Sequence, residues 1–194
     1  MSSQLLKGKK GIISGALNNM SIAWKVAERA AEEGAEIVLT NAPIAMRMGE
    51  INGLAEKINA PIFAADATNE ADLENLFDKS MEHFGGKVDF VLHSIGMSPN
   101  VRKGRHYTDL NYEWYKQSLD VSAMSLHKML ATAYKKDAIS DWGSVVALSY
   151  IAAQRTFPDY SDMADAKALL ESIAKLGTLL FVIFRYLQIS HLVI

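Results

Sequence analysis

The chain has 194 residues, 49% of them hydrophobic and 22% charged, which is typical of one globular domain with a full apolar core. The net charge of −2 gives no electrostatic argument for nucleic acid or an anionic membrane as a partner. The absence of cysteine excludes disulfides and thiolate metal sites, and no signal-peptide pattern precedes Gly15, so we expect a cytoplasmic protein.

Short apolar runs alternate with longer helical patterns along most of the chain. We expect strands at residues 11–14, 36–40, 61–65, 88–94 and 144–149. Helices are expected between them, at 22–33, around 46–58, and along an apolar stripe from Leu73 to Phe84 that Thr68 or Asn69 would cap. This alternation predicts an α/β fold, a Rossmann-type doubly wound parallel sheet in three α/β/α layers.

The last segment, residues 178–194, differs from the rest because it is apolar and nearly uncharged. It is too short, and interrupted by Arg185 and His191, to be read as a membrane span. We therefore divide the chain into a dinucleotide-binding and catalytic domain at 1–177 and an atypical apolar tail at 178–194. The tail is expected to be an edge strand or a poorly specified segment, with residues 179–184 as one candidate strand.

A glycine-bearing turn follows the first expected strand. Gly15 ends the strand, and a helix opens at Ser21 and Ile22, an arrangement that presents backbone N–H groups to a pyrophosphate. The Gly-x-Gly-x-x-Gly fingerprint is absent, so a plain strand-to-helix turn remains an alternative. No acidic residue follows the second strand, and Arg47 leaves NADPH as an alternative to NADH.

Tyr160 and Lys167 are seven residues apart, which on an α-helix places both side chains on one face about 10 Å apart. A phenol on that face can meet a substrate carbonyl while the ammonium reaches a ribose hydroxyl. The alternative is an amphipathic helix with an exposed lysine and a half-buried tyrosine. His93, within an expected strand, is interpreted as a packed, hydrogen-bonded residue, and no histidine shows metal-ligand spacing.

These motifs resemble the NADH-dependent enoyl-acyl-carrier-protein reductases, a divergent branch of the short-chain dehydrogenases. The resemblance runs from about residue 5 to residue 174. It rests on Gly-x5-Ser-Ile-Ala from Gly15, on Asp66 with Ala67, on Ser94-Ile95-Gly96, and on Tyr-x6-Lys with Tyr150 upstream.

The resemblance implies reduction of the trans-2 double bond of an enoyl thioester in fatty-acid synthesis, on an acyl-carrier protein and with NADH favoured over NADPH. It implies no metal, no nucleic acid and no membrane, and a homo-oligomer, a tetramer in the family. Its implied catalytic residues are Tyr150, Tyr160 and Lys167. Its implied cofactor-binding residues are Gly15, Ser21, Ile22, Asp66, Ala67, Ser94, Ile95, Gly96 and Lys167.

The tail matches nothing in this family, whose later strands and substrate-binding segment are expected to be missing here. Weak or absent turnover is therefore one expectation. The alternatives are another short-chain reductase that acts on a carbonyl, and a non-catalytic cofactor-binding or assembly subunit.

Overall fold

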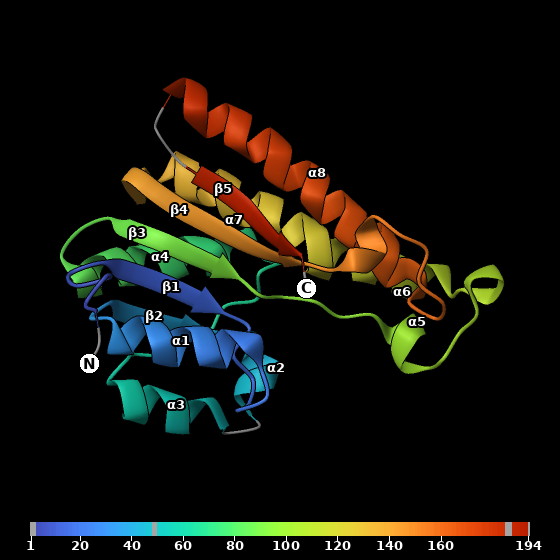
Figure 1. Ribbon diagram of the computed structural model, residues 1–194, viewed down its shortest axis with the longest axis horizontal. Coiled ribbons are helices and arrows are strands. Elements are labelled where there is room, and N and C mark those ends of the chain that lie inside the picture. The colour runs from blue at the N-terminus through green and yellow to red at the C-terminus, as the bar shows by residue number, and fades with distance from the viewer. Residues whose placement is uncertain (1–2, 48–49, 185–187, 194) are drawn as a thin grey trace.

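A five-stranded parallel sheet forms the middle layer of the protein (Figure 1). The computed structural model describes residues 3–47, 50–184 and 188–193. The strand order is β2-β1-β3-β4-β5, and every neighbouring pair is parallel. The predicted α/β class is confirmed. The strands are β1 (Lys10–Ser14), β2 (Glu36–Thr40), β3 (Val88–His93), β4 (Ile139–Ser149) and β5 (Gln188–Val193).

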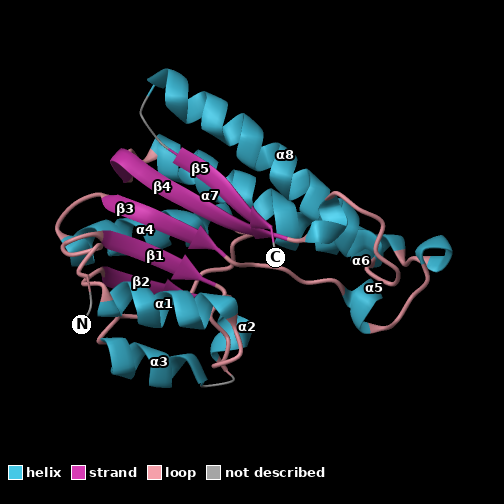
Figure 2. Ribbon diagram, viewed as in Figure 1, coloured by secondary structure: helices cyan, strands magenta, loops and turns pink. Residues whose placement is uncertain are grey.

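Helices cover both faces of the sheet (Figure 2). Helices α1 and α3 lie on one face, and α4, α7 and α8 pack into the apolar core of the other. The described helices are α1 (Ile22–Glu32), α2 (Pro43–Met46), α3 (Glu50–Ile58), α4 (Glu70–Phe84), α5 (Pro99–Arg102), α6 (Tyr112–Leu119), α7 (Ser125–Lys135) and α8 (Ser161–Phe184). Two short 3-10 helices, η1 (Tyr107–Asp109) and η3 (Ile151–Ala153), and one π-helical turn, η2 (Asp120–Met124), complete the described helical elements.

Burial on both faces explains why the central strands are continuously apolar. Ile12 and Ile13 are both fully buried, and because successive strand residues point to opposite faces, they enter different cores. Ile12 packs in the core that includes Leu126 of α7, whereas Ile13 packs in the core that includes Ala27 of α1.

Helix α4 begins where the sequence pattern predicts. Asn69 is the capping residue, since its side chain accepts hydrogen bonds from the backbone N–H groups of Ala71 and Asp72. Thr68, the alternative cap, instead donates its hydroxyl to Asp66. The helix ends at Gly85, whose φ of 62° closes the last turn.

Two strand predictions change in detail. Residues 61–65 form only an isolated bridge, between Ile62 and Leu39, rather than a strand of the sheet. Pro61 has no N–H to donate, which limits the pairing at this edge. The strand expected at 144–149 begins earlier, at Ile139, and its pairing with β3 shifts register at a β-bulge or irregularity between Val88 and Phe90.

The expected strand at residues 179–184 is wrong, because α8 continues as a helix through Phe184. A strand beyond β4 does exist, but it is β5, which pairs in parallel with β4. A short apolar run cannot by its periodicity alone distinguish strand from buried helix. Helix α8 also crosses the expected domain boundary at 177. Within the described residues, no helix combines the length and apolar character needed to cross a membrane.

Between β3 and α7 the chain leaves the sheet and forms a projecting segment that contains α5, η1 and α6, on the right of Figure 1. Its base is held by Asn100, which is fully buried. The Asn100 side chain donates from Nδ2 to the Asn111 carbonyl at 3.1 Å and accepts from the Asn111 N–H at 3.0 Å. The start of α5 and the start of α6 are therefore fixed to each other, which closes the loop that contains η1.

Candidate active site

The strand order reverses direction between β1 and β3, since β2 lies outside β1 and β4 lies outside β3. Loops that leave the carboxyl ends of such a strand pair diverge to opposite faces and open a crevice. Gly15 follows β1, and Ser94 follows β3. The topology thus places the Gly15 turn next to the segment that begins at Ser94, and both contain predicted cofactor-binding residues.

The turn after β1 requires glycine. Gly15 has a φ of 86°, and a Cβ there would collide with the carbonyl group of Ser94. Only a residue without a side chain lets the turn lie against the end of β3 at this φ. This close approach makes Gly15 a defined structural requirement of the crevice.

Ser21 stabilises the same turn from within. Its hydroxyl accepts hydrogen bonds from the N–H groups of Leu17 and Asn18, at 3.1 and 3.0 Å. Ser21 is also the N-cap position of α1, whose first residue is Ile22. The amino end of α1, with its positive dipole end, is thereby held at the crevice.

Asn41 takes the position after β2 where many dinucleotide enzymes carry an acid. Its Nδ2 donates to the Ala16 carbonyl at 3.2 Å, and its Oδ1 accepts from the Ala42 N–H at 2.9 Å. The side chain therefore ties the glycine turn to the end of β2. Arg47, the residue that suggested NADPH as an alternative cofactor, is exposed. It does not line the cavity that Asn41 lines.

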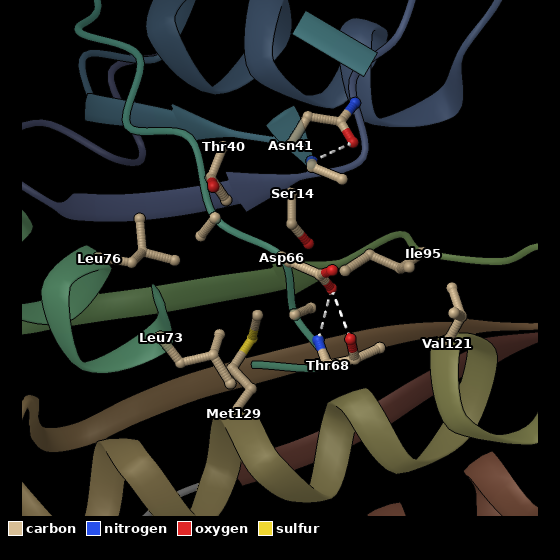
Figure 3. Close-up of a pocket in the computed structure, with 13 residues that line it drawn as sticks. Ser14, Thr40, Asn41, Asp66, Thr68, Leu73, Leu76, Ile95, Val121 and Met129 are labelled. Carbon is tan, nitrogen blue, oxygen red and sulfur yellow. Dashed lines mark hydrogen bonds between the residues drawn. The ribbon is translucent and has the colours of Figure 1, made fainter. Parts of the chain in front are cut away.

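A narrow cavity of about 60 Å³ opens beside this edge (Figure 3). Asp66 and Ala67, two of the residues that the resemblance implies for cofactor binding, line this cavity. Asp66 Oδ1 accepts from the N–H and the hydroxyl of Thr68, at 2.9 and 2.7 Å, which fixes the carboxylate at the cavity. The other lining residues are Ser14, Thr40, Asn41, Ala42, Ala65, Thr68, Leu73, Leu76, Ile95, Val121 and Met129.

A second cavity, of about 280 Å³, lies at the ends of β3 and β4. Ile95 lines both cavities, so the two are neighbours and suit an elongated ligand. All three predicted catalytic residues line the second cavity. Its lining residues are Ile22, Ser94, Ile95, Gly96, Leu148, Ser149, Tyr150, Tyr160, Met163 and Lys167.

Tyr160 lies against Tyr150, with ring centroids 4.5 Å apart and planes tilted by 39°. Phe157 meets both rings edge-on, at 5.5 Å from Tyr150 and 6.3 Å from Tyr160. Burial, and then the neighbouring Tyr150, raise the pKa of the Tyr160 phenol. The phenol is therefore protonated at neutral pH and can donate a hydrogen bond.

Tyr160 does not belong to the helix that carries Lys167, contrary to the sequence prediction. Helix α8 begins at Ser161, and Ser161 itself has a φ of 48°. The rule of seven residues per two helical turns consequently fails for this pair. The two side chains still share the cavity because the turn before α8 folds Tyr160 back toward it.

Lys167 points its ammonium at the ends of two strands. Its Nζ donates to the carbonyl oxygens of Leu148 at 2.7 Å and Ile95 at 3.5 Å. Burial in this site lowers the pKa of Lys167 to about 8. Three N–H bonds are available, so these two acceptors among the described residues leave one for a ligand.

Gly96 and Met163 form the wall next to Lys167. A Cβ on Gly96 would lie 3.7 Å from Lys167 Nζ and 3.8 Å from Met163 Cε, so a larger residue would occupy ligand space. Met163 was not predicted as a site residue. Its position four residues before Lys167, one helical turn away, is the pattern that identifies it.

Glu171 is a second residue that the sequence pattern did not single out. It is buried, one turn after Lys167, and accepts from the Ser149 hydroxyl at 2.7 Å. Gln154 also donates to it, at 3.2 Å. Glu171 thus holds the chain on both sides of Tyr150.

His93 is the packed histidine that the sequence indicates. It is fully buried, and its Nε2 lies 2.8 Å from Ser125 Oγ. Burial, followed by the charge of Lys167, lowers the His93 pKa to about 3. A neutral imidazole with this pKa is unsuited to act as a base at neutral pH. No cluster of three metal-ligating side chains occurs among the residues described.

Comparison with known proteins relates this site to a family. The family model described as Enoyl-(Acyl carrier protein) reductase matches residues 15–178. The NADH-dependent enoyl-acyl-carrier-protein reductase FabI of Rickettsia felis is 37% identical over 177 residues, which are 90% of this chain and 66% of that protein. Enoyl-acyl-carrier-protein reductase (NADH) 1 of Rhizobium meliloti is 35% identical over 172 residues, 88% of this chain and 62% of that protein.

Solved structures agree with this relationship. FabI from Alistipes finegoldii is 65% identical, with a TM-score of 0.95, and the match covers 97% of this chain and 72% of that one. A FabI–NADH complex from the same organism has the same identity and TM-score and is covered over 66% of its length. The chain spans 62–66% of the length of the curated relatives from Rickettsia felis and Rhizobium meliloti.

Proposed function

Because the chain belongs to the enoyl-acyl-carrier-protein reductase family, we propose that it reduces the trans-2 double bond of an enoyl thioester with NADH. The observation that carries the proposal is the cavity in which Tyr150, Tyr160 and Lys167 meet the Ser94–Gly96 segment. Two tyrosines and one buried lysine beside a dinucleotide crevice suit a reaction in which negative charge develops on a carbonyl oxygen.

Tyr160 is assigned as the donor to that oxygen. Charge collects on the thioester oxygen while the β-carbon is reduced, and a preplaced hydroxyl stabilises this charge more in the transition state than in the ground state. The raised pKa of the Tyr160 phenol keeps its proton in place at neutral pH. Tyr150, in ring contact with Tyr160, would line the acyl pocket near the thioester.

Lys167 is assigned two roles. Its remaining N–H would bind a hydroxyl of the nicotinamide ribose, and its charge would favour negative charge on the nearby oxygen. The hydrogen bonds to Leu148 and Ile95 hold the ammonium at the strand ends. Because the Lys167 side chain is buried, water screens its charge only weakly. Its attraction for a negative charge on a neighbouring oxygen is correspondingly stronger than at the protein surface.

The residues of the crevice fit a bound dinucleotide. Gly15 and the amino end of α1, with Ser21 and Ile22, would hold the pyrophosphate. Asp66 and Ala67 would face the adenine, and the cavity that Gly96 leaves open beside Lys167 would take the nicotinamide end. NADH supplies the hydride when bound. The FabI–NADH complex of the relative from Alistipes finegoldii favours NADH over NADPH.

The partner is then an acyl-carrier protein that presents the enoyl chain, as the names of the relatives indicate. A cytoplasmic homo-oligomer, in the family a tetramer, belongs to the same proposal. Weak or absent turnover, expected from the sequence of the tail, stays a prediction that the activity assay decides.

The test is a steady-state assay with a crotonyl thioester and NADH, on the wild-type chain and on Tyr160→Phe and Lys167→Met. NADH oxidation that depends on the enoyl substrate and falls by about 100-fold or more in Tyr160→Phe, the scale of a lost transition-state donor, supports the proposal. Reduction of a ketone panel but of no enoyl thioester would show a carbonyl reductase. NADH binding without turnover of either class would show a cofactor-binding subunit.

A further inference from the structure

The turn that presents Tyr160 is strained on both sides. Asp159 has a φ of 61° and Ser161 a φ of 48°, in the left-handed region that residues with side chains rarely adopt. Such conformations cost conformational free energy and persist only where surrounding contacts enforce them. Something must therefore hold this turn in place.

The next residue, Asp162, supplies those contacts. Its side chain is completely buried and accepts three hydrogen bonds from neutral donors. Ser98 donates at 2.6 Å, Ser118 at 2.7 Å and the Asn100 amide at 2.9 Å. A carboxylate only accepts hydrogen bonds, so its chemistry matches a ring of donors in a way that no neutral residue of the same size does.

The three donors belong to the segment that leaves the catalytic cavity. Ser98 lies two residues after Gly96, and both Asn100 and Ser118 belong to the short helices beyond it. Ser122 fixes the opposite side of this segment, because its hydroxyl bonds both the N–H and the carbonyl of Met97, at 2.9 and 3.1 Å. Asp162 thus joins the strained turn to a segment that is itself fixed.

A second carboxylate on α8 continues the same contact. Asp165 accepts from the hydroxyls of Tyr107 and Tyr115, at 3.0 and 2.8 Å. Tyr107 is exposed, however, and the Tyr115 bond is only partly buried, whereas the three bonds of Asp162 include fully buried ones. The buried link closest to Tyr160 is therefore the one through Asp162.

We propose that Asp162 is a positioning residue, which holds the strained Tyr160 turn at a fixed place against Ser98, in the segment that follows Gly96 of the catalytic cavity. The inference rests on the proposed function, because it acts through the placement of the Tyr160 hydroxyl. It assigns Asp162 no contact with substrate or cofactor. Substitution of Asp162 therefore lowers the rate of the chemical step. It leaves dinucleotide binding in the crevice at Gly15 and Asp66 unchanged.

The informative variant is Asp162→Asn, which keeps the size of the side chain. Its amide places an NH₂ group where one carboxylate oxygen accepted a hydrogen bond, so that two donors face each other. The matched control is Asp89→Asn, since Asp89 also accepts from three donors, Lys10 N, Ser140 Oγ and Lys9 Nζ. Asp89 lies at the amino end of β3, whereas the site lies at the carboxyl ends of the strands.

We expect Asp162→Asn to lower kcat about 10- to 100-fold, the scale of a displaced catalytic group. The NADH dissociation constant, measured by fluorescence titration, should stay within about two-fold, since no crevice residue changes. Asp89→Asn should leave kcat within the same two-fold range. Equal kcat in wild type and Asp162→Asn well below the unfolding temperature would overturn the proposal, as would an equal loss in Asp89→Asn.

Ser118→Ala is the second variant, for the case that Asp162→Asn does not fold. It removes one donor from α6 and should lower kcat by a smaller factor at unchanged NADH affinity. Hydrogen–deuterium exchange separates this inference from the proposed function. If the wild type reduces no enoyl thioester, faster exchange of amides 160–164 in Asp162→Asn still supports Asp162 as the anchor of the turn. Unchanged exchange there would refute it.

Discussion

Lys167 should make the stability of the protein depend on pH in an unusual direction. Burial lowers its pKa from 10.5 to about 8, so the folded state disfavours the charged form. Between those two values the unfolded chain binds more protons than the folded one, and stability rises with pH. The free-energy cost of burying the charged Lys167 ammonium is fully present below pH 8 and disappears by about pH 10.5.

Each unit of pKa shift corresponds to roughly 1.4 kcal/mol, so the total penalty is on the order of 3 kcal/mol. From pH 7 to pH 9.5 the wild type should gain about 2 kcal/mol of unfolding free energy relative to Lys167→Met, which cannot titrate. Urea unfolding of both proteins at the two pH values measures this difference, and titration of other groups cancels in the comparison.

Lys175→Met, an exposed lysine on the same helix, is the control and should follow the wild type. The reasoning is refuted if the difference between wild type and Lys167→Met is the same at both pH values. A difference that shrinks as the pH rises would mean that Lys167 gains from its charge in the folded state, opposite to the effect of burial.

Three further predictions concern activity and local stability. First, kcat/KM should fall as the pH rises through about 8, because free Lys167 loses the charge that favours the developing oxyanion; a pH profile with no inflection there would contradict this role. Second, Gly15→Ala should weaken NADH binding and destabilise the protein by at least about 1 kcal/mol, since a Cβ collides with Ser94 at a positive φ; titration and urea unfolding measure both. Third, Asn69→Ala should cost about 1 kcal/mol of unfolding free energy through loss of the α4 cap and leave kcat unchanged; a loss of kcat would show that α4 affects the site.

The elements that local patterns control were predictable. The boundaries of β2 agree with the apolar run at 36–40, and Asn69 caps α4 because capping depends on adjacent residues. Residues 61–65 and 179–184 were misassigned, since pairing at a sheet edge and continuation of a helix depend on neighbours distant in the chain.

The candidate site shows the same division. Gly15 and Lys167 stand out through spacing and composition, and both lie beside Ser94, which the Gly15 turn contacts and which lines the Lys167 cavity. The anchor at Asp162 has partners 64, 62 and 44 residues away in sequence. The positive φ of Ser161, which excludes Tyr160 from the helix, is likewise a product of tertiary contacts and has no local signal.

The central claim is that hydride reaches the β-carbon of an enoyl thioester while Tyr160 and Lys167 stabilise the oxygen. Incubation of the chain with a crotonyl thioester and NADH that carries deuterium at both C4 positions of the nicotinamide, followed by mass spectrometry and NMR of the product, tests it directly. The account predicts a saturated thioester with deuterium on its third carbon, and at least about 100-fold less of this product from Tyr160→Phe over the same time. Deuterium on a carbinol carbon from a ketone substrate, with the crotonyl thioester unchanged, would contradict it.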